Sequence, residues 1–318
     1  MIVRYGAMLL IAGAVLAAAA GSQERGREAD TLPQTFTEPT TGMEFVFIKG
    51  GCYEMGDTFG EGGKDEQPVH NVCVDDFYLG RYEVTNAQFS AFIEATKYRT
   101  TAEVKGSGWG VRQDGPGEWR EWSGLSWRHP IWPGDDIARK MSHPVVQVSW
   151  YDAREFASWL SARNKRAVRL PYEAEWEYAA RSGGKPHRYS WGNGAPSGNV
   201  ADIRSRKVQP RMEIFEGYDD GNQYTAPVGS YKANELGIHD MTGNVWEWCD
   251  DWYGQHYYEE SPKRNPRGPA SGQKKVDRGG SWSNMPAVSR AANRDDADPN
   301  LRFFNVGFRL VLPVSSVR

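Results

Sequence analysis

Apolar residues recur at helical spacing in three segments of the chain. One segment begins after Thr85, which forms a capping-box pattern with Gln88, and a second begins after Ser149. The third runs from Tyr172 to about Arg181, behind a proline that suits a helix start. The recurring apolar positions are Phe89, Phe92 and Ile93 in the first segment and Ala153, Phe156, Ala157 and Leu160 in the second. These patterns predict three helices whose apolar faces pack in the core.

Outside these segments the pattern is typical of short strands. Strand-like runs, MEFVFIKGGCYEMG (43–56) and HNVCVDDFYLG (70–80), precede the first helix. After about residue 184 only short apolar runs remain among Gly, Pro, Asn and Asp. No internal repeat of about 20 to 50 residues is visible, and no Gly/Ser-rich or Pro-rich linker divides the chain. We therefore predict one irregular α+β domain over residues 41–318.

The segment between Tyr98 and Asp136 has few periodic signals but is rich in tryptophan. It contains Trp109, Trp119, Trp122, Trp127 and Trp132. A long irregular segment inside a compact domain is usually functional or disordered, and this many tryptophans argue against disorder.

The first twenty residues have the order of a secretory signal peptide. One basic residue is followed by an apolar run, then by three alanines (18–20) and a polar stretch. An uncleaved membrane anchor is the alternative, but the run is shorter than the ~20 apolar residues that span a bilayer. Residues 21–40 are polar, contain two prolines and predict a flexible leader. The expected location is the periplasm or the cell exterior, with no stable membrane span after signal cleavage.

The composition is ordinary for a globular protein, with 39% apolar and 25% charged residues. The formal net charge of -3 and the absence of long like-charge runs argue against nucleic acid or an anionic membrane as a partner. The 35 glycines and 13 tryptophans are more informative about the fold than the net charge is. Glycine allows irregular backbone and tryptophan buries a large apolar area, so we expect a loop-rich fold held by aromatic packing.

Export changes the interpretation of the three cysteines, because disulfides form in oxidising compartments. Cys52 and Cys73 each lie in a strand-like run, and a hairpin-like pairing of these runs would bring their Cα atoms within the ~6 Å that a disulfide needs. Two buried free thiols are the alternative. Cys249 lies in an aromatic run and is expected to be a packing residue.

Common catalytic signatures are absent from the sequence, which has no His-Glu-x-x-His, no Gly-x-Ser-x-Gly and no P-loop. The six histidines are scattered without ligand spacing: His70, His129, His143, His187, His239 and His256. The run GSGWG (106–110) is similar to a dinucleotide-binding turn, but no strand is predicted before it and no helix after it.

Three polar turns are more informative. The stretch RGGSWSN (278–284) combines two glycines with serine, tryptophan and asparagine, which favours a tight turn that lines a pocket. Asp240 and Glu247 lie around a glycine turn, and Asn199 with the segment 219–222 offers a second set of oxygen atoms. Calcium takes six to eight such oxygens, but the spacing alone favours turn residues that bond their own backbone.

Six ordered motifs extend over much of the chain. They are WRHP (127–130), HPVVQVSWYDA (143–153), RLPYEAEWEYAAR (169–181), GNVWEW (243–248), DRGGSW (277–282) and NVGFRL (305–310). Together they closely resemble the formylglycine-generating enzyme, or sulfatase-modifying factor, family. The N-terminal GGCYEMG, EQPVH and DDFYLGRYEVTNAQF also fit. The resemblance implies an α+β fold of low regular secondary structure, related to C-type lectins, with calcium bound structurally.

Carried over residue by residue, the resemblance implies two calcium sites. One consists of Asn199, the Val200 carbonyl, Asp220 and the Asn222 carbonyl. The other consists of Asp240, the Gly243 and Val245 carbonyls, and Glu247. Asp240 stands where family members often have asparagine, which also provides an oxygen.

The enzymes of this family oxidise a cysteine of a target sulfatase to formylglycine with O2 and a copper ion held by two cysteines. Those cysteines follow the Arg-Gly-Gly-Ser turn, and soft thiolates are the ligands that select Cu(I). Here Asn284 stands in place of the first cysteine, and the second position falls near Ser289. Neither side chain binds Cu(I) well, so we expect no copper.

Three functions follow from the resemblance and its missing cysteines. In the first, an exported, calcium-stabilised protein binds a peptide, protein or small molecule in the family cleft without catalysis. In the second, an oxidoreductase or maturation enzyme of altered chemistry acts on a secreted metabolite or protein. In the third, the chain forms formylglycine after all. The expected pocket residues are Trp246, Ser281, Trp282, Asn284, Arg290 and Arg294.

Overall fold

The computed structural model of the chain describes Met1 and residues 34–111 and 119–317. The predicted signal peptide (1–20) lies outside the described residues except for Met1, as does most of the predicted leader (21–40). In residues 34–111 and 119–317, no helix has both the length and the apolar character needed to cross a membrane.

All three predicted helices are confirmed. They are α1 (Asn86–Thr96), α3 (Trp150–Asn164) and α4 (Glu173–Ala180). The Thr85 hydroxyl accepts a hydrogen bond from the Gln88 backbone N–H, and the Gln88 side chain accepts one from the Thr85 N–H. Ser149 caps α3 in the same way with Asp152. The capping residues read from the sequence therefore fix where both helices begin.

The shorter helices were not predicted, because one or two turns leave too few residues for apolar periodicity. They are the α-helices α2 (Thr101–Lys105), α5 (Ser205–Val208) and α6 (Tyr257–Glu260) and the 3-10 helices η1 (Lys64–Glu66), η2 (Pro286–Val288) and η3 (Val314–Ser316).

The strands in the described residues form two four-stranded sheets and two hairpins. The first sheet has the order β1 (Thr35–Thr37), β2 (Glu44–Ile48), β5 (Phe77–Gly80) and β12 (Val311–Pro313). The second has the order β10 (Asp295–Ala297), β9 (Lys275–Arg278), β8 (Trp246–Trp252) and β11 (Val306–Gly307). The hairpins are β3 (Gly51–Met55) with β4 (His70–Val74), and β6 (Ser107–Gly110) with β7 (Arg120–Ser123). These strand pairs are antiparallel except β8 with β11.

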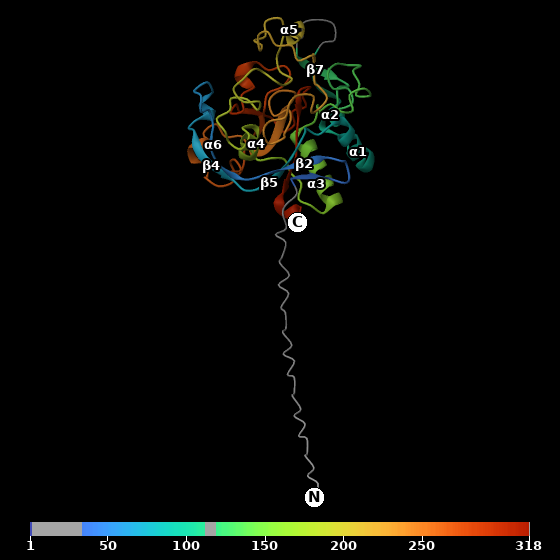
Figure 1. The fold of residues 1–318 in the computed structure, drawn as a ribbon. Helices are drawn as coiled ribbons and strands as arrows, with labels where there is room; N and C mark the ends of the chain where they lie inside the picture. The colour runs from blue at the N-terminus through green and yellow to red at the C-terminus, as the bar shows by residue number, and fades with distance from the viewer. Residues whose placement is uncertain (2–33, 112–118, 318) are drawn as a thin grey trace. The chain divides into compact units, whose positions relative to one another are not determined.

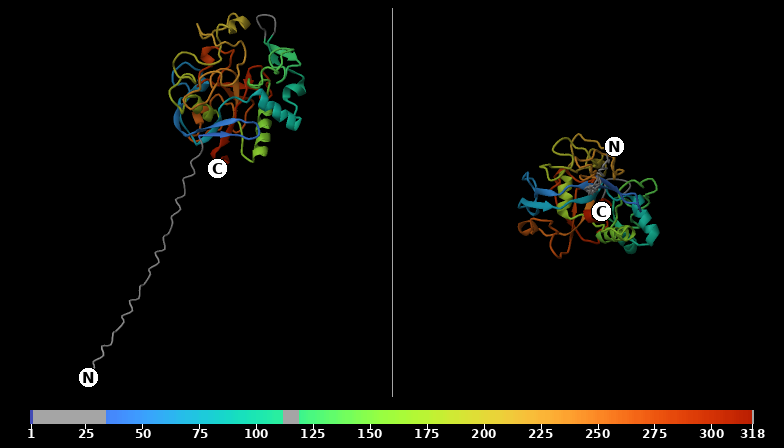
Figure 2. Two further views of the ribbon diagram at one scale, coloured as in Figure 1. Left: turned by 45° about the vertical axis from the view of Figure 1, so that its right-hand side comes forward. Right: turned by 60° about the horizontal axis from the view of Figure 1, so that its bottom comes forward.

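The first sheet joins the two ends of the described fold. β1 and β2 come from its start and β12 from its end, and both groups pair around β5 (Figures 1 and 2). Because Thr35 to Thr37 pair in register with Glu44 to Val46, the domain begins before the predicted boundary at residue 41. The boundary was set too late because a three-residue strand in a polar segment has no visible pattern.

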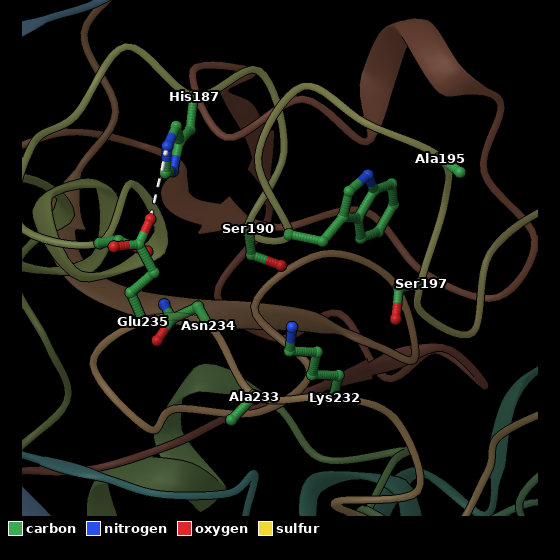
Figure 3. A pocket seen from close by; sticks show the side chains of 10 residues that line it. His187, Ser190, Ala195, Ser197, Lys232, Ala233, Asn234 and Glu235 are labelled. Carbon is green, nitrogen blue, oxygen red and sulfur yellow. Dashed lines mark ion pairs between the residues drawn. The ribbon is translucent and has the colours of Figure 1, made fainter.

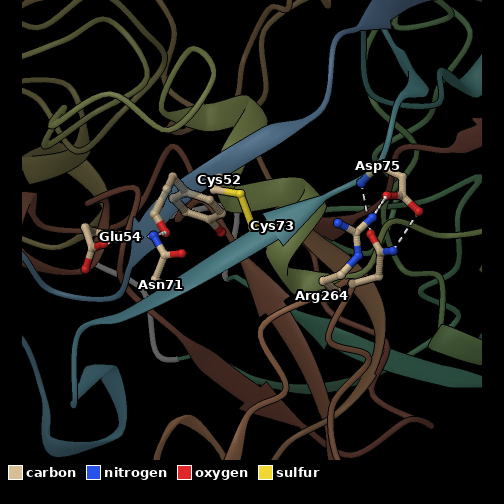
Figure 4. The surroundings of a disulfide bond; sticks show 8 residues. Cys52, Glu54, Asn71, Cys73, Asp75 and Arg264 are labelled. Carbon is tan, nitrogen blue, oxygen red and sulfur yellow. Dashed lines mark hydrogen bonds and ion pairs between the residues drawn. A yellow bond between two sulfur atoms is a disulfide. The ribbon is translucent and has the colours of Figure 1, made fainter.

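The disulfide prediction is confirmed. Cys52 and Cys73 are register partners in the β3–β4 hairpin, with 3.9 Å between their Cα atoms, and their sulfur atoms are bonded (Figure 4). The alternative of two free thiols is therefore wrong. Cys249, in β8, is free and fully buried, as the aromatic run around it predicts.

The helix α4 lies at the centre of the packing. All eight of its residues are buried, and it contacts the strands β3, β4, β8 and β9 (Figure 1). A helix that is covered all round belongs to the core of a protein. Here the covered helix also carries charge, because Glu173 and Glu177 lie on it.

These two buried glutamates bind arginines from distant parts of the chain. Arg278 donates to Glu173 at 2.8 Å and to Glu177 at 2.5 Å. Arg294 binds both carboxylate oxygens of Glu173, at 2.7 and 2.9 Å. Burial alone would raise the pKa of Glu173, but Arg294 and Arg278 outweigh it and hold the pKa below its usual value. The pairs tie α4 to β9 and to the segment that leads into β10.

Replacing Glu173 with glutamine should destabilise the fold strongly. The substitution leaves Arg278 and Arg294 buried with one charged partner fewer, and breaking a buried pair in this way costs about 3 to 5 kcal/mol. Thermal or urea unfolding at pH 7 measures the loss, with Glu260→Gln, an exposed carboxylate, as the matched control.

The pH dependence gives an independent check. The depressed pKa of Glu173 means that its contribution is present above the unfolded-state pKa of ~4.3 and is lost as the pH falls through the lower folded-state value. The difference between the wild-type protein and Glu173→Gln should therefore shrink in acid. A difference that stays constant down to pH 2 would contradict the assignment.

Candidate functional site

The stretch from Arg278 to Asn284 leaves β9 through a tight turn. Gly279 and Gly280 have φ angles of 100° and 70°, a region that L-residues rarely adopt. A Cβ on Gly280 would lie 2.9 Å from the Ser289 hydroxyl oxygen, and one on Gly279 would lie 3.0 Å from the Trp176 ring. Both glycines are therefore needed for conformation and for space.

The turn brings Asn284 and Ser289 together. The Ser289 hydroxyl donates to the backbone carbonyl of Asn284 at 3.3 Å and to that of Met285 at 3.0 Å. The Ser281 hydroxyl donates to the Asn284 side-chain oxygen, and the Asn305 amide donates to the Ser281 hydroxyl at 2.9 Å. Asn284 is half-buried and Ser289 is buried. The two positions thus lie in one hydrogen-bonded cluster of neutral polar groups.

The two arginines expected in the pocket are already paired. Arg290 binds both oxygens of Glu66 at 2.7 Å, and Arg294 binds Glu173 as described above. The two arginines are only 5% and 6% exposed. Neither guanidinium group is free to bind a ligand. Instead, the two arginines anchor the segment that follows the turn, Arg290 to Glu66 and Arg294 to Glu173.

The two expected pocket tryptophans are buried. Trp246 is 5% exposed and belongs to the main core, while Trp282 is 2% exposed. Trp282 packs against Tyr224 and Phe304, with ring centroids 5.1 and 5.6 Å apart. Contact of either tryptophan with a ligand stays a prediction.

A hollow of about 310 Å³ lies beside this turn. Pro286, Ala287 and Arg290 line one side of it, and Glu61, Arg188 and Tyr189 line the other. The Tyr189 hydroxyl donates to the Pro286 carbonyl at 3.3 Å, which joins the two sides. The turn therefore borders a space large enough for a small ligand or a peptide side chain.

The residues present do not fit a copper ion of the family type. Asn284 and Ser289 provide an amide and a hydroxyl where Cu(I) needs thiolates. Cys52 and Cys73 are consumed in the disulfide. Cys249 is buried without exposure, and burial raises the pKa of its thiol well above the usual value. The donor set for Cu(I) is missing from this turn.

The structure brings Val200, Asp220 and Asn222 of the first expected calcium set into contact, and calcium binding there stays a prediction. Asp220 accepts backbone hydrogen bonds from Val200 at 3.1 Å and from Asn222 at 2.7 Å. The side-chain oxygen of Asn199 is buried and has no hydrogen-bond partner among the described residues. Burial, together with the carboxylate of Asp202, raises the pKa of Asp220 to about 7. An unpaired buried oxygen and a carboxylate with a raised pKa within one set of residues are a suitable environment for a metal ion.

The second expected set surrounds the turn that leads into β8. Asp240 and Gly243 have left-handed backbone, with φ of 58° and 89°. One Asp240 oxygen accepts a backbone hydrogen bond at 2.7 Å, while the other is buried and has no partner among the described residues. Glu247 differs, because Arg309 donates to both of its oxygens at 2.6 Å. A carboxylate keeps further lone pairs, so Glu247 can still accept a cation.

The charge around this second set is unbalanced. Glu83, Asp240 and Glu247 are 1%, 8% and 1% exposed, and Arg309, which pairs with Glu247, also acts to lower the pKa of Glu83 and of Asp240. Burial, with Asp240 and Glu247, raises the pKa of Glu83 well above its usual value. Buried negative charge in excess is costly unless a cation compensates it.

In residues 34–111 and 119–317, no three His, Cys, Asp or Glu side chains are grouped as metal ligands. Both sets rely instead on backbone carbonyl and amide oxygens beside one or two carboxylates, which hard cations accept. The unpaired oxygens of Asn199 and Asp240 and the surplus negative charge fit calcium. Neither set contains sulfur or imidazole, so neither suits a soft metal.

Comparison with known proteins agrees with this architecture. The sequence profile of the sulfatase-modifying factor enzyme 1-like domain matches residues 30–314. This chain belongs to that family. The match begins before residue 41, in agreement with the early position of β1. The predicted family and its α+β fold are therefore confirmed.

Similar sequences include two proteins named formylglycine-generating enzyme. The one from Streptomyces coelicolor is 38% identical over 296 residues, which cover 87% of this chain and 91% of that protein. The one from Mus musculus is 34% identical over 311 residues, which cover 91% of this chain and 81% of that protein.

A similar solved structure is that of PvdO from Pseudomonas aeruginosa, with 27% identity and a TM-score of 0.67. It covers 90% of this chain and 100% of PvdO. The crystal structure of CarF is 26% identical with a TM-score of 0.54, and the match covers 85% of this chain and 98% of CarF.

Two site residues were missed by the sequence analysis. Glu83 was not singled out in the sequence. Its carboxylate accepts hydrogen bonds from the Asn244 side chain at 2.6 Å and from the Val245 N–H at 3.3 Å. Asn305 lies in the NVGFRL motif but contacts the distant Ser281. Both lie within quoted family motifs, so the signal was present, but their partners are set by tertiary contacts.

Proposed function

We propose that this protein is an exported, calcium-stabilised member of the family that binds a peptide or small molecule beside the 281–290 turn, the segment from Ser281 to Arg290 that follows the two glycines, and that it does not form formylglycine through copper. One observation carries the proposal. Gly279 and Gly280, which lead into this turn, are present, but the Ser289 hydroxyl donates a hydrogen bond to the Asn284 backbone carbonyl where the family enzymes carry two thiolates. The hollow beside the turn provides the space for the ligand.

The Cys52–Cys73 disulfide supports export, because such bonds persist in oxidising compartments. The order of residues 1–20 supports it independently. Two similar proteins are named formylglycine-generating enzyme, which argues for that activity in this chain. The proposed absence of formylglycine formation therefore requires a direct test.

The first test measures oxidation. The purified protein is incubated with Cu(I), O2 and a cysteine-containing sulfatase peptide, and the peptide is analysed by mass spectrometry. We expect no conversion above a control without protein, because the thiolate pair that holds the metal is missing. Conversion above that control would make the proposal wrong.

The second test measures copper binding without any turnover. We expect Asn284→Cys/Ser289→Cys to retain Cu(I) against a chromophoric chelator, because the Ser289 hydroxyl already reaches the Asn284 backbone. The wild-type protein should release the ion, and the single variant Asn284→Cys serves as the matched control. Equal retention by the wild-type protein and the double variant would show that another site holds copper and would contradict the proposal.

Calcium removal tests the structural metal. A ligand at about 100 times its Kd stabilises the native state by about 2.7 kcal/mol, so a chelator should lower Tm by several degrees, and calcium should restore it. Asp220→Ala should reduce the shift, whereas Glu94→Gln, an exposed carboxylate, should leave it unchanged. An unchanged melting curve after chelation would remove the calcium assignment.

A further inference from the structure

A second hollow, of about 300 Å³, lies apart from the 281–290 turn. Residues 182–197, which follow α4, form one wall, and residues 232–235 form the other (Figure 3). None of its lining residues belongs to the expected pocket or to either calcium set. A volume near 300 Å³ is at the lower end of small-ligand sites.

The hollow contains an unpaired cation. Lys232 is exposed, and no hydrogen bond or ion pair of its ammonium group occurs within the described residues. In Figure 3 this ammonium group points toward Ser190, with Ser197 lining the same hollow. The hydroxyls of Ser190 and Ser197 also lack partners among the described residues. One ammonium and two hydroxyls are a suitable donor set for an oxyanion.

The acidic group of the hollow is already neutralised. Glu235 pairs with Lys185, and its other oxygen lies 3.8 Å from the His187 ring nitrogen. The uncompensated charge in the hollow is therefore that of Lys232, which favours an anion over a cation.

Three other polar atoms in the lining are buried and have no partner among the described residues. They belong to the Ser182 hydroxyl, His187 Nδ1 and the indole N–H of Trp191. Ser182 is only 4% exposed, and its left-handed φ of 51° follows from its position at the end of α4. Buried polar groups without partners, gathered in one place, need an explanation such as a bound ligand.

The walls of the hollow are fixed without a ligand. The Ser190 N–H donates to the Thr242 hydroxyl at 2.9 Å, which holds one wall. The Asn234 amide donates to the Ala179 carbonyl at 2.8 Å and holds the other wall against α4. Trp191 stacks on Tyr189 with 4.8 Å between ring centroids. Because these groups are already ordered, binding costs little conformational entropy.

We propose that this hollow binds a small organic oxyanion, a carboxylate or a phosphate monoester. Its charged group contacts Lys232, Ser190 and Ser197, and its apolar part lies against Trp191. The site shares no residue with the turn that carries the proposed function, so either can fail alone.

Titration calorimetry with phenylacetate, phenyl phosphate and the neutral phenylacetamide tests the site on the full-length protein. We expect at least one anion to bind and phenylacetamide to bind at least about tenfold more weakly, because hydrogen bonds to charged groups are the stronger ones. Binding of only phenylacetate identifies a carboxylate site, and binding of only phenyl phosphate identifies a phosphate site. If neither anion binds, or if phenylacetamide binds equally well, the proposal is overturned.

Variants locate the binding. Lys232→Met keeps the aliphatic stem and should weaken anion binding about tenfold or more, and Ser190→Ala should weaken it several-fold. Lys263→Met, at another exposed lysine, is the matched control and should bind as the wild type does. Melting curves confirm that each variant is folded. Equal affinities of Lys232→Met and Lys263→Met would place the anion elsewhere and overturn the proposal.

Discussion

Pairing of buried arginines with carboxylates is the interaction on which the rest of this structure depends. The described fold has short strands and only three helices of eight or more residues, so regular backbone pairing alone joins few of its segments. Glu173 on α4 holds both Arg278 and Arg294, and Glu66 holds Arg290. Each pair joins positions more than a hundred residues apart. Because an unpaired buried charge is so costly, these pairs determine which segments can meet.

The same pairs explain the shape of the 281–290 turn and its lack of free charge. Arg278 fixes the start of the turn against α4, while Arg290 and Arg294 fix the segment that follows it. Asn284 and Ser289 then lie at a set separation inside this frame. The frame does not depend on thiolates at these two positions. Asn284 and Ser289 take part in neutral hydrogen bonds inside it.

Charge that is not paired points to the remaining sites. The carboxylates of Glu83, Asp240 and Glu247 outnumber their arginine partner, and Asp220 has Asp202 as a carboxylate neighbour and no ion pair within the described residues. In the hollow beside α4 the imbalance is reversed, because the acid is paired and Lys232 is free. The first imbalance suits a divalent cation and the second an anion. Both inferences follow from which charged groups the tertiary contacts pair and which they leave unpaired.

The sequence by itself determined the local elements and the family. Capping residues such as Thr85 and Ser149, apolar spacing, and the two cysteines of one hairpin act over short distances, so their outcome can be read directly from neighbouring residues. The missing thiolates at Asn284 and Ser289 were visible for the same reason. Only the tertiary structure decided that Arg290 and Arg294 are paired and that Lys232 is not. Whether a charged side chain is paired depends on residues far away in the chain, and no local sequence pattern identifies those residues.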